Sequence, residues 1–165
     1  MADYPLDNVD RAILFELQRD ARNNTNADIA ERIDVSASTI SKRIARLEKE
    51  GVLRGYDPDI DYERAGFPLQ VLFICTVSIT EREEIIQQAL EIDTVVNVRE
   101  MMTGEGNVHI QVVGRTNEDV TQSAHRIDDL GFTVTDEILM RDEYTRPSIL
   151  FNDPESEQVS QDREL

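Results

Sequence analysis

The side chains with the most evident chemical potential lie in one stretch of the sequence, residues 36–54. This stretch holds five basic residues against two acidic ones, a local charge of +3, in a protein whose formal charge is −17. Lys and Arg neutralise the phosphates of nucleic acids, and this attraction supplies most of the non-specific affinity for DNA. A basic stretch in an acidic protein therefore indicates an anionic partner for this part of the chain.

The spacing within the stretch predicts a helix over 36–50 with Ser36 as its N-cap. Ile40, Ile44 and Leu47 form one apolar face, and at about 100° per residue most of the basic side chains fall on the other. Small hydroxyl residues in the first turn can approach base edges in a major groove. We expect phosphate contacts from Lys42, Arg46, Lys49 and Arg54, and base contacts from Ser38, Thr39, Ser41 and Arg43 beside the capping Ser36.

The segments around the basic helix predict a winged helix-turn-helix unit. Apolar residues at helical spacing indicate a first helix over 8–19 and a second, short helix that ends near Asp34. After the basic helix, 52–56 and 60–62 are expected to form the two short strands of a wing. We place this DNA-binding domain at residues 1–66.

Residues 67–151 predict a second domain in which the hydrophobic period changes to two, as in strands. The order of expected elements is β-α-β-β-α-β, a ferredoxin-like unit, so that the whole chain is an α+β protein. Beyond it, 152–165 is acidic and poor in apolar residues, and we expect this tail to be disordered. The expected strands cover 69–79, 95–102, 107–114 and 132–140, with helices over 80–91 and 116–131 between them.

Several classes of protein are excluded by what the sequence lacks. Cys75 is the sole cysteine, and His109 and His125 do not stand in metal-ligand spacing with it, so we expect neither metal nor cofactor. No phosphate-binding or nucleophile motif is present, which argues against an enzyme. The longest apolar run is too short to span a bilayer and no signal peptide is evident, so we expect a cytoplasmic protein.

The charge composition suggests a salt-rich environment. Lys42 and Lys49 are the only lysines, against 15 arginines and 34 acidic residues. A carboxylate-rich surface is tolerated where dissolved ions screen its self-repulsion, so we expect a halophilic source. The alternative is an acidic protein from an ordinary cytoplasm.

Three groups of residues resemble the Lrp/AsnC, or feast/famine, transcriptional regulators. They are Leu6-Asp7-x-x-Asp10-x-x-Ile13-Leu14, the pattern from Ile29-Ala30 through Val35-Ser36 to Leu47-Glu48, and Gly51-Val52-Leu53-x-Gly55-Tyr56 followed by Gly66. The resemblance implies an N-terminal winged helix-turn-helix and a C-terminal ferredoxin-like domain that binds effectors. It also implies homodimers that assemble further, as tetramers or octamers of dimers.

The same resemblance places a small effector, typically an amino acid, near the turn between the second and third strands. Gly104 and Glu105 match the family, whereas Gly106 and Asn107 replace an aromatic residue and a carboxylate. Glu105 could accept hydrogen bonds from an ammonium, and the glycines allow backbone N–H groups to approach a carboxylate. The alternative is a hairpin turn without a ligand. The candidate effector residues are Thr103, Gly104, Glu105, Gly106 and Asn107, with Thr133 and Thr135 on the last strand.

We therefore expect a sequence-specific transcription regulator that binds double-stranded DNA and responds to an amino acid or another small metabolite. Two alternatives stay open. One is a chromatin-like protein that compacts DNA with little sequence preference. The other is a metabolite-sensing interaction protein whose helix-turn-helix no longer binds DNA.

Overall fold

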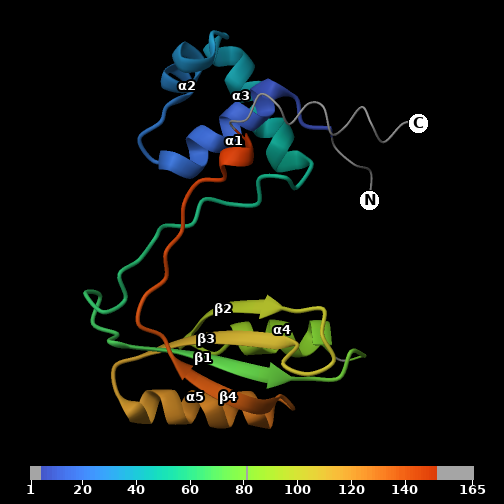
Figure 1. Cartoon of the computed structure of the whole chain (residues 1–165), viewed down its shortest axis with the longest axis vertical. Helices are drawn as coiled ribbons and strands as arrows, with labels where there is room; N and C mark the ends of the chain where they lie inside the picture. Colours follow the sequence, from blue (N-terminus) through green and yellow to red (C-terminus); the bar gives the residue numbers. More distant parts are fainter. Residues whose placement is uncertain (1–4, 81, 152–165) are drawn as a thin grey trace. The chain divides into compact units, whose positions relative to one another are not determined.

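The computed structural model describes residues 5–80 and 82–151 (Figure 1). These residues divide into two compact units: the chain up to Pro58 together with the chain from Tyr144 onward, and Asp59–Glu143. The elements are α1 (Asn8–Asp20), α2 (Asn26–Ile33), α3 (Ala37–Lys49), β1 (Leu69–Thr76), α4 (Arg82–Leu90), β2 (Val95–Glu100), β3 (Val108–Gly114), α5 (Asn117–Asp129), β4 (Thr133–Leu139) and the 3-10 helix η1 (Ile149–Phe151).

The first unit contains the three predicted helices, each begun by a side-chain cap. Asp7 caps α1 and Thr25 caps α2, both in reciprocal capping boxes that occupy N–H groups left without helical partners. Asp34 adopts the left-handed conformation (φ 56°, ψ 47°) and turns the chain from α2 into α3. The helices enclose a small apolar core of Ile13, Leu14, Leu17, Ile29, Ala30, Ile40 and Leu47.

The two predicted wing strands are absent from the described chain, where 52–62 forms no strand. An isolated two-stranded hairpin has little stability of its own. The backbone N–H groups of Val52 and Leu53 instead donate to the carbonyl of Leu47 and close the C-terminus of α3. The Tyr56 hydroxyl donates to Glu48 on α3 (3.1 Å). Residues 52–56, the first expected wing strand, are thus held against the end of α3 without forming a strand.

The second unit confirms the predicted β-α-β-β-α-β order. Its four strands form one antiparallel sheet in the order β2-β3-β1-β4. Alternate residues of β1, including Phe73 and Cys75, pack in one apolar cluster with Ala89 of α4 and Ile127 of α5. Both helices therefore cover the same face, while Leu72 and Ile74 alternate onto the other and are half-buried.

Strand β1 is shorter than predicted, because the side chain of Asn107 binds the backbone just beyond its end. β1 ends at Thr76 rather than at residue 79. The carboxamide of Asn107 forms two hydrogen bonds with the backbone of Val77, one to its N–H and one to its carbonyl, both 3.0 Å. The Asn107 side chain thus takes the place of a neighbouring strand as the hydrogen-bond partner of the Val77 backbone. The predicted β2-β3 hairpin is confirmed.

The first unit also includes a segment, 144–151, that the sequence predicts as part of the second domain. η1 contacts α1, the Phe151 side chain packs against the helical core, and the Ser148 N–H donates to Gln18 of α1 (3.0 Å). The structure therefore divides the chain after residue 58 and before residue 144, whereas the sequence predicts boundaries at 66 and 151. The predicted tail, 152–165, lies outside the described residues.

Cys75 is buried, and this burial raises the pKa of its thiol to about 12, so it is a neutral core residue at ordinary pH. Within 5–80 and 82–151, no group of three His, Cys, Asp or Glu side chains is placed to hold a metal ion. In the same residues, no helix has the length and apolar character needed to span a membrane.

The packing of Phe151 gives a first prediction. Phe151→Ala removes a ring from a small core, and we expect the first unit to lose about 1–3 kcal/mol of stability. Hydrogen exchange monitored by mass spectrometry should show faster exchange of the α1 amides. Leu150→Ala is the matched control, because the Leu150 side chain is 67% exposed. Equal exchange in the two variants would contradict the docking of η1.

Candidate nucleic-acid interface

Helix α3 is held by one buried face and one capped end. Ile40 and Leu47 are fully buried in the core of the first unit. The Ser36 side chain accepts from the Thr39 N–H (3.1 Å) at the start of the helix. Since the buried side chains fix the rotation of α3 about its axis, its other face must meet solvent.

The outward face of α3 carries most of the predicted contacts. Ser38, Lys42, Arg46 and Lys49 are exposed, and so is Arg54 in the segment after the helix. Within the described chain, neither Lys42 nor Lys49 forms an ion pair. The two ammonium groups are therefore available to an external anion. We call Lys42, Arg46 and Lys49 the basic face of α3.

The hydroxyl groups of the first turn form a local cluster. The Ser36 hydroxyl lies 3.0 Å from that of Ser38 and 2.8 Å from that of Thr39. Ser36 is thus occupied by capping, and Thr39 is half-buried. Ser38 is exposed and does not cap the helix, so it is the strongest candidate for a base contact in this turn.

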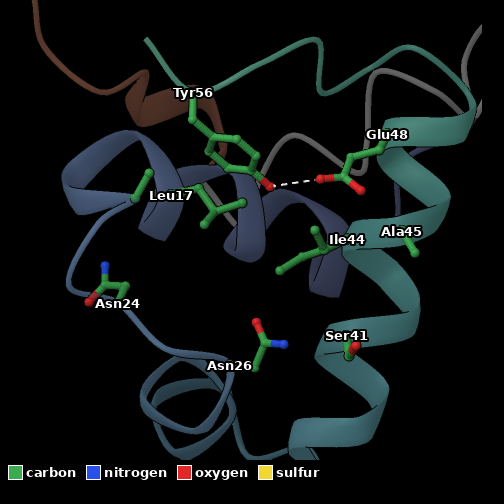
Figure 2. Close-up of a pocket in the computed structure, with 9 residues that line it drawn as sticks. Leu17, Asn24, Asn26, Ser41, Ile44, Ala45, Glu48 and Tyr56 are labelled. Atoms are coloured by element: carbon green, nitrogen blue, oxygen red, sulfur yellow. Dashed lines mark hydrogen bonds between the residues drawn. The ribbon is translucent and has the colours of Figure 1, made fainter. Parts of the chain in front are cut away.

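Ser41 lies toward a shallow hollow between α1 and α3 of about 370 Å³. Figure 2 shows its side chain beside Ile44 and Ala45, with Asn24 and Asn26 across the hollow. Burial, and then the nearby Glu48, raise the pKa of the Tyr56 phenol at the rim. Ser41 is therefore placed at the edge of the basic face of α3 and not at its centre.

Arg43 is turned back toward the first helix. Its Nη1 lies 2.7 Å from Asp7 Oδ2 and 3.2 Å from Asp10 Oδ1, and the Asp10 side chain is 1% exposed. Partial burial acts to raise the pKa of Asp7, but hydrogen bonds from the Asp10 N–H and from Arg43 outweigh it and lower the pKa. The same pairing with Asp7 raises the pKa of Arg43. We therefore do not retain Arg43 as a base contact, because its guanidinium braces α3 against the start of α1.

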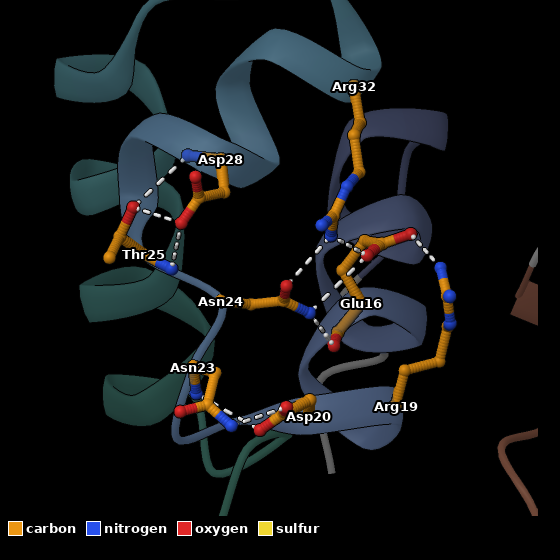
Figure 3. A network of polar contacts seen from close by, with 8 residues as sticks. All are labelled: Glu16, Arg19, Asp20, Asn23, Asn24, Thr25, Asp28 and Arg32. Carbon is orange, nitrogen blue, oxygen red and sulfur yellow. Dashed lines mark hydrogen bonds and ion pairs between the residues drawn. The ribbon is translucent and has the colours of Figure 1, made fainter.

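A second polar network braces α2 against α1 and was not foreseen from the sequence. The nearly buried Glu16 carboxylate accepts from Arg19 (3.2 Å) and Arg32 (Figure 3). Asn24 donates to the Glu16 carbonyl (2.8 Å) and accepts from Arg32 (2.8 Å). Glu16 and Arg32 are 16 residues apart and lie on different helices, a separation at which charge spacing along one helix gives no signal.

The candidate effector turn uses several of its polar groups internally. Asn107 is 2% exposed and is bound to Val77, as described above. The Gly106 N–H donates to the Thr76 hydroxyl (2.9 Å), and the Thr103 hydroxyl donates to the Glu105 carbonyl (2.6 Å). Gly106 also has φ 59°, a conformation that disfavours other residues. Gly104 and the side chain of Glu105 remain exposed.

The two threonines of β4 lie at different distances from this turn. Thr133 pairs in register with Thr76, the residue that accepts from Gly106, so the sheet brings Thr133 close to the turn. The Thr135 hydroxyl donates to the Ile74 carbonyl (2.9 Å). Both threonines are exposed. The candidate effector residues therefore cluster at one end of the sheet, except that the side chain of Asn107 points inward.

Comparisons with known proteins bear on the helix-turn-helix of the first unit and on the fold of the whole chain. A family model described as winged helix-turn-helix DNA-binding matches residues 6–54. The HTH-type transcriptional regulator AldR of Mycobacterium tuberculosis is 36% identical over 118 residues, which cover 70% of this chain and 65% of the relative. The leucine-responsive regulatory protein of Rhizobium meliloti is 33% identical over 112 residues, 66% of this chain and 70% of the relative.

Solved structures resemble both units. The crystal structure of MtbAldR has a TM-score of 0.72 at 28% identity and covers 87% of this chain and 99% of its own. The structure of AsnC from E. coli has a TM-score of 0.67 at 21% identity, covering 87% of this chain and 97% of its own, and shows likeness of fold.

The bracing role of Arg43 leads to a second prediction. Arg43→Gln removes the ion pair between Arg43 and the buried Asp10, and we expect a loss of about 2–3 kcal/mol in unfolding free energy by urea denaturation. Lys42→Gln, one residue away and exposed, should change stability by less than about 0.5 kcal/mol. If Arg43→Gln changes base preference while stability is unchanged, the residue contacts DNA after all.

Proposed function

We propose that this chain, which belongs to the Lrp/AsnC-type helix-turn-helix transcriptional regulators, binds double-stranded DNA through α3 and regulates transcription at specific sites. The observation that carries the proposal is the exposed basic face of α3, set on a capped helix whose other face is buried. Lys42, Arg46 and Lys49 contact phosphates, and Arg54 supplies a further backbone contact. Ser38 contacts base edges, with Thr39 and Ser41 beside it. No catalytic step is assigned to the protein.

The separate roles proposed for the lysines and for Ser38 of α3 lead to a third prediction. Lys42→Gln and Lys49→Gln should each weaken binding to all DNA sequences and lower the slope of log K against log[KCl] by about 1. Ser38→Ala should leave the slope unchanged and alter the preferred bases. Fluorescence anisotropy with a panel of duplexes at several KCl concentrations measures both.

Arg64→Gln is the matched control, since it also removes one positive charge, and Arg64 is 89% exposed in the second unit. An unchanged salt slope in both lysine variants would remove α3 as the phosphate contact. Footprinting that finds no preferred sites for the parent protein would instead favour the DNA-compacting alternative. Absence of DNA binding at any salt concentration would favour a metabolite-sensing interaction protein.

The second unit serves in this proposal as the site of pairing between subunits and of effector binding. The sheet face opposite α4 and α5 carries Leu72 and Ile74, and Ile138 beside Leu72 is 43% exposed. Apolar side chains on an uncovered sheet face favour association with a second copy, so the regulator acts as a homodimer, and dimers assemble further as tetramers or octamers of dimers. Glu105 and Gly104 offer the accessible polar groups for an amino acid or a similar metabolite.

The acidic surface suits a protein that works in the cytoplasm of a cell with high internal salt. A formal charge of −17 on 165 residues repels itself, and dissolved ions screen this repulsion. A fourth prediction is that the thermal midpoint rises between about 0.1 M and 2 M KCl, where the Debye length falls from about 10 Å to below about 3 Å. Circular dichroism measures the midpoint, and equal midpoints would argue against salt adaptation.

A further inference from the structure

The chain returns to the DNA-binding unit just before its acidic tail. Ser148 donates to Gln18 of α1, and Phe151 packs on the apolar core that also buries Ile40 and Leu47 of α3. Residue 152 therefore continues from the unit that presents the basic face of α3, although the sheet domain precedes it in sequence. The start of the acidic tail and the basic face of α3 are therefore both attached to the apolar core of the first unit.

The charges of the tail and of this face are opposite. Residues 152–165 contain five acidic residues and one arginine, a formal charge of −4. The basic face of α3 and the neighbouring Arg54 are exposed cations on the anchoring unit. Carboxylates attract such cations as phosphates do, although the tail carries fewer negative charges per unit length than DNA.

We propose that residues 152–165 bind the basic face of α3 of their own chain and compete with DNA for it. The proposal rests on the proposed function only in naming DNA as the competing ligand. The tail is then a tethered, weak anionic ligand that lowers the affinity for every duplex by the same factor, because it occupies the same phosphate-binding side chains whatever the DNA sequence.

The length of the tail is sufficient. Fourteen residues span at most about 46–50 Å when extended and about 20 Å on average as a flexible chain. A compact unit of about 60 residues is about 25–30 Å across, and the 13 residues of α3 span about 20 Å. A tether of this size gives an effective concentration in the millimolar range.

Such a concentration makes weak pairing effective. If the tail binds with a dissociation constant near 1 mM, a few millimolar effective concentration reduces the apparent DNA affinity by about 3–6-fold. Because the contacts are exposed ion pairs, this reduction should fade as the Debye length shortens toward about 3 Å at 1 M salt. The tail therefore flattens the salt dependence of DNA binding.

The placement of lysine in this sequence allows a direct test without DNA. Lys42 and Lys49 are the only lysines of the chain, and both lie on the basic face of α3. A carbodiimide joins a lysine amine to a carboxylate in contact with it. In the full-length protein at about 0.1 M KCl we expect mass spectrometry to find peptides that join Lys42 or Lys49 to residues 152–165.

Three controls make the cross-linking decisive. Mixing isotope-labelled and unlabelled chains shows whether a link lies within one chain, and a link only between chains would overturn the proposal. Coupling of added glycinamide to the tail carboxylates proves that they were activated. Activated tails without a link to Lys42 or Lys49 would also overturn it, and excess duplex DNA or about 2 M KCl should abolish the link.

A DNA-binding measurement tests the competition itself. Neutralising the tail should tighten binding about 3–6-fold at about 0.1 M KCl, with the difference lost near 1 M. The same number of exposed carboxylates, neutralised on the second unit, is the control for net charge and should give a smaller change. The tail variant is Asp153→Asn, Glu155→Gln, Glu157→Gln, Asp162→Asn and Glu164→Gln, and the control is Glu83→Gln, Glu84→Gln, Glu91→Gln, Asp128→Asn and Asp129→Asn.

The outcomes separate this inference from the proposed function. Equal tightening by the two variants would mean that only net charge matters, and no tightening would mean that the tail does not compete. Either result overturns the inference and leaves DNA binding intact. Failure of all variants to bind DNA would overturn the proposed function, and the cross-linking would still decide whether the tail occupies α3.

Discussion

The orientation of α3 depends on how firmly its inner face is held by a very small core. Ile40 and Leu47 bury that face completely, and Arg43 adds an ion pair to the nearly inaccessible Asp10. A buried carboxylate that loses its cation is costly, so this contact strongly disfavours rotation of the helix. Because the inner face is fixed twice, by apolar packing and by charge, the lysines on the outer face must project into solvent.

The second constraint is the negative charge of the whole chain. A protein with twice as many acidic as basic residues meets polyanionic DNA at a disadvantage, which the local positive charge around α3 offsets over a short range. Many of its carboxylates are used structurally at the same time. Asp7, Thr25 with Asp28, and Thr116 with Asp119 form capping boxes, in which anionic side chains also interact favourably with helix N-termini.

The lowered pKa values give this capping a pH dependence. The pKa of Asp28 is lowered mainly by its hydrogen bonds with Thr25, and that of Asp119 by the N–H groups of Arg115 and Thr116. A carboxyl whose pKa is lower in the folded state stabilises the fold above its unfolded pKa, near about 4, and loses this contribution as the pH falls through the folded value. The helix starts are therefore acid-sensitive and are fully formed at neutral pH.

Local sequence was sufficient for most elements and for the outward side of α3. The three-residue and four-residue apolar spacing of the helices and the β-α-β-β-α-β order depend on neighbours within a few residues, and both were predicted. Only the tertiary structure decided the contacts between residues that lie far apart in the sequence. Arg43 pairs with residues 33 or more positions away, Asn107 binds the backbone of Val77, and Phe151 joins a core begun at Ile13. Periodicity indicates which face of an element is apolar, but a partner across the fold exists only once the chain has closed, so these roles were decided by the folded chain.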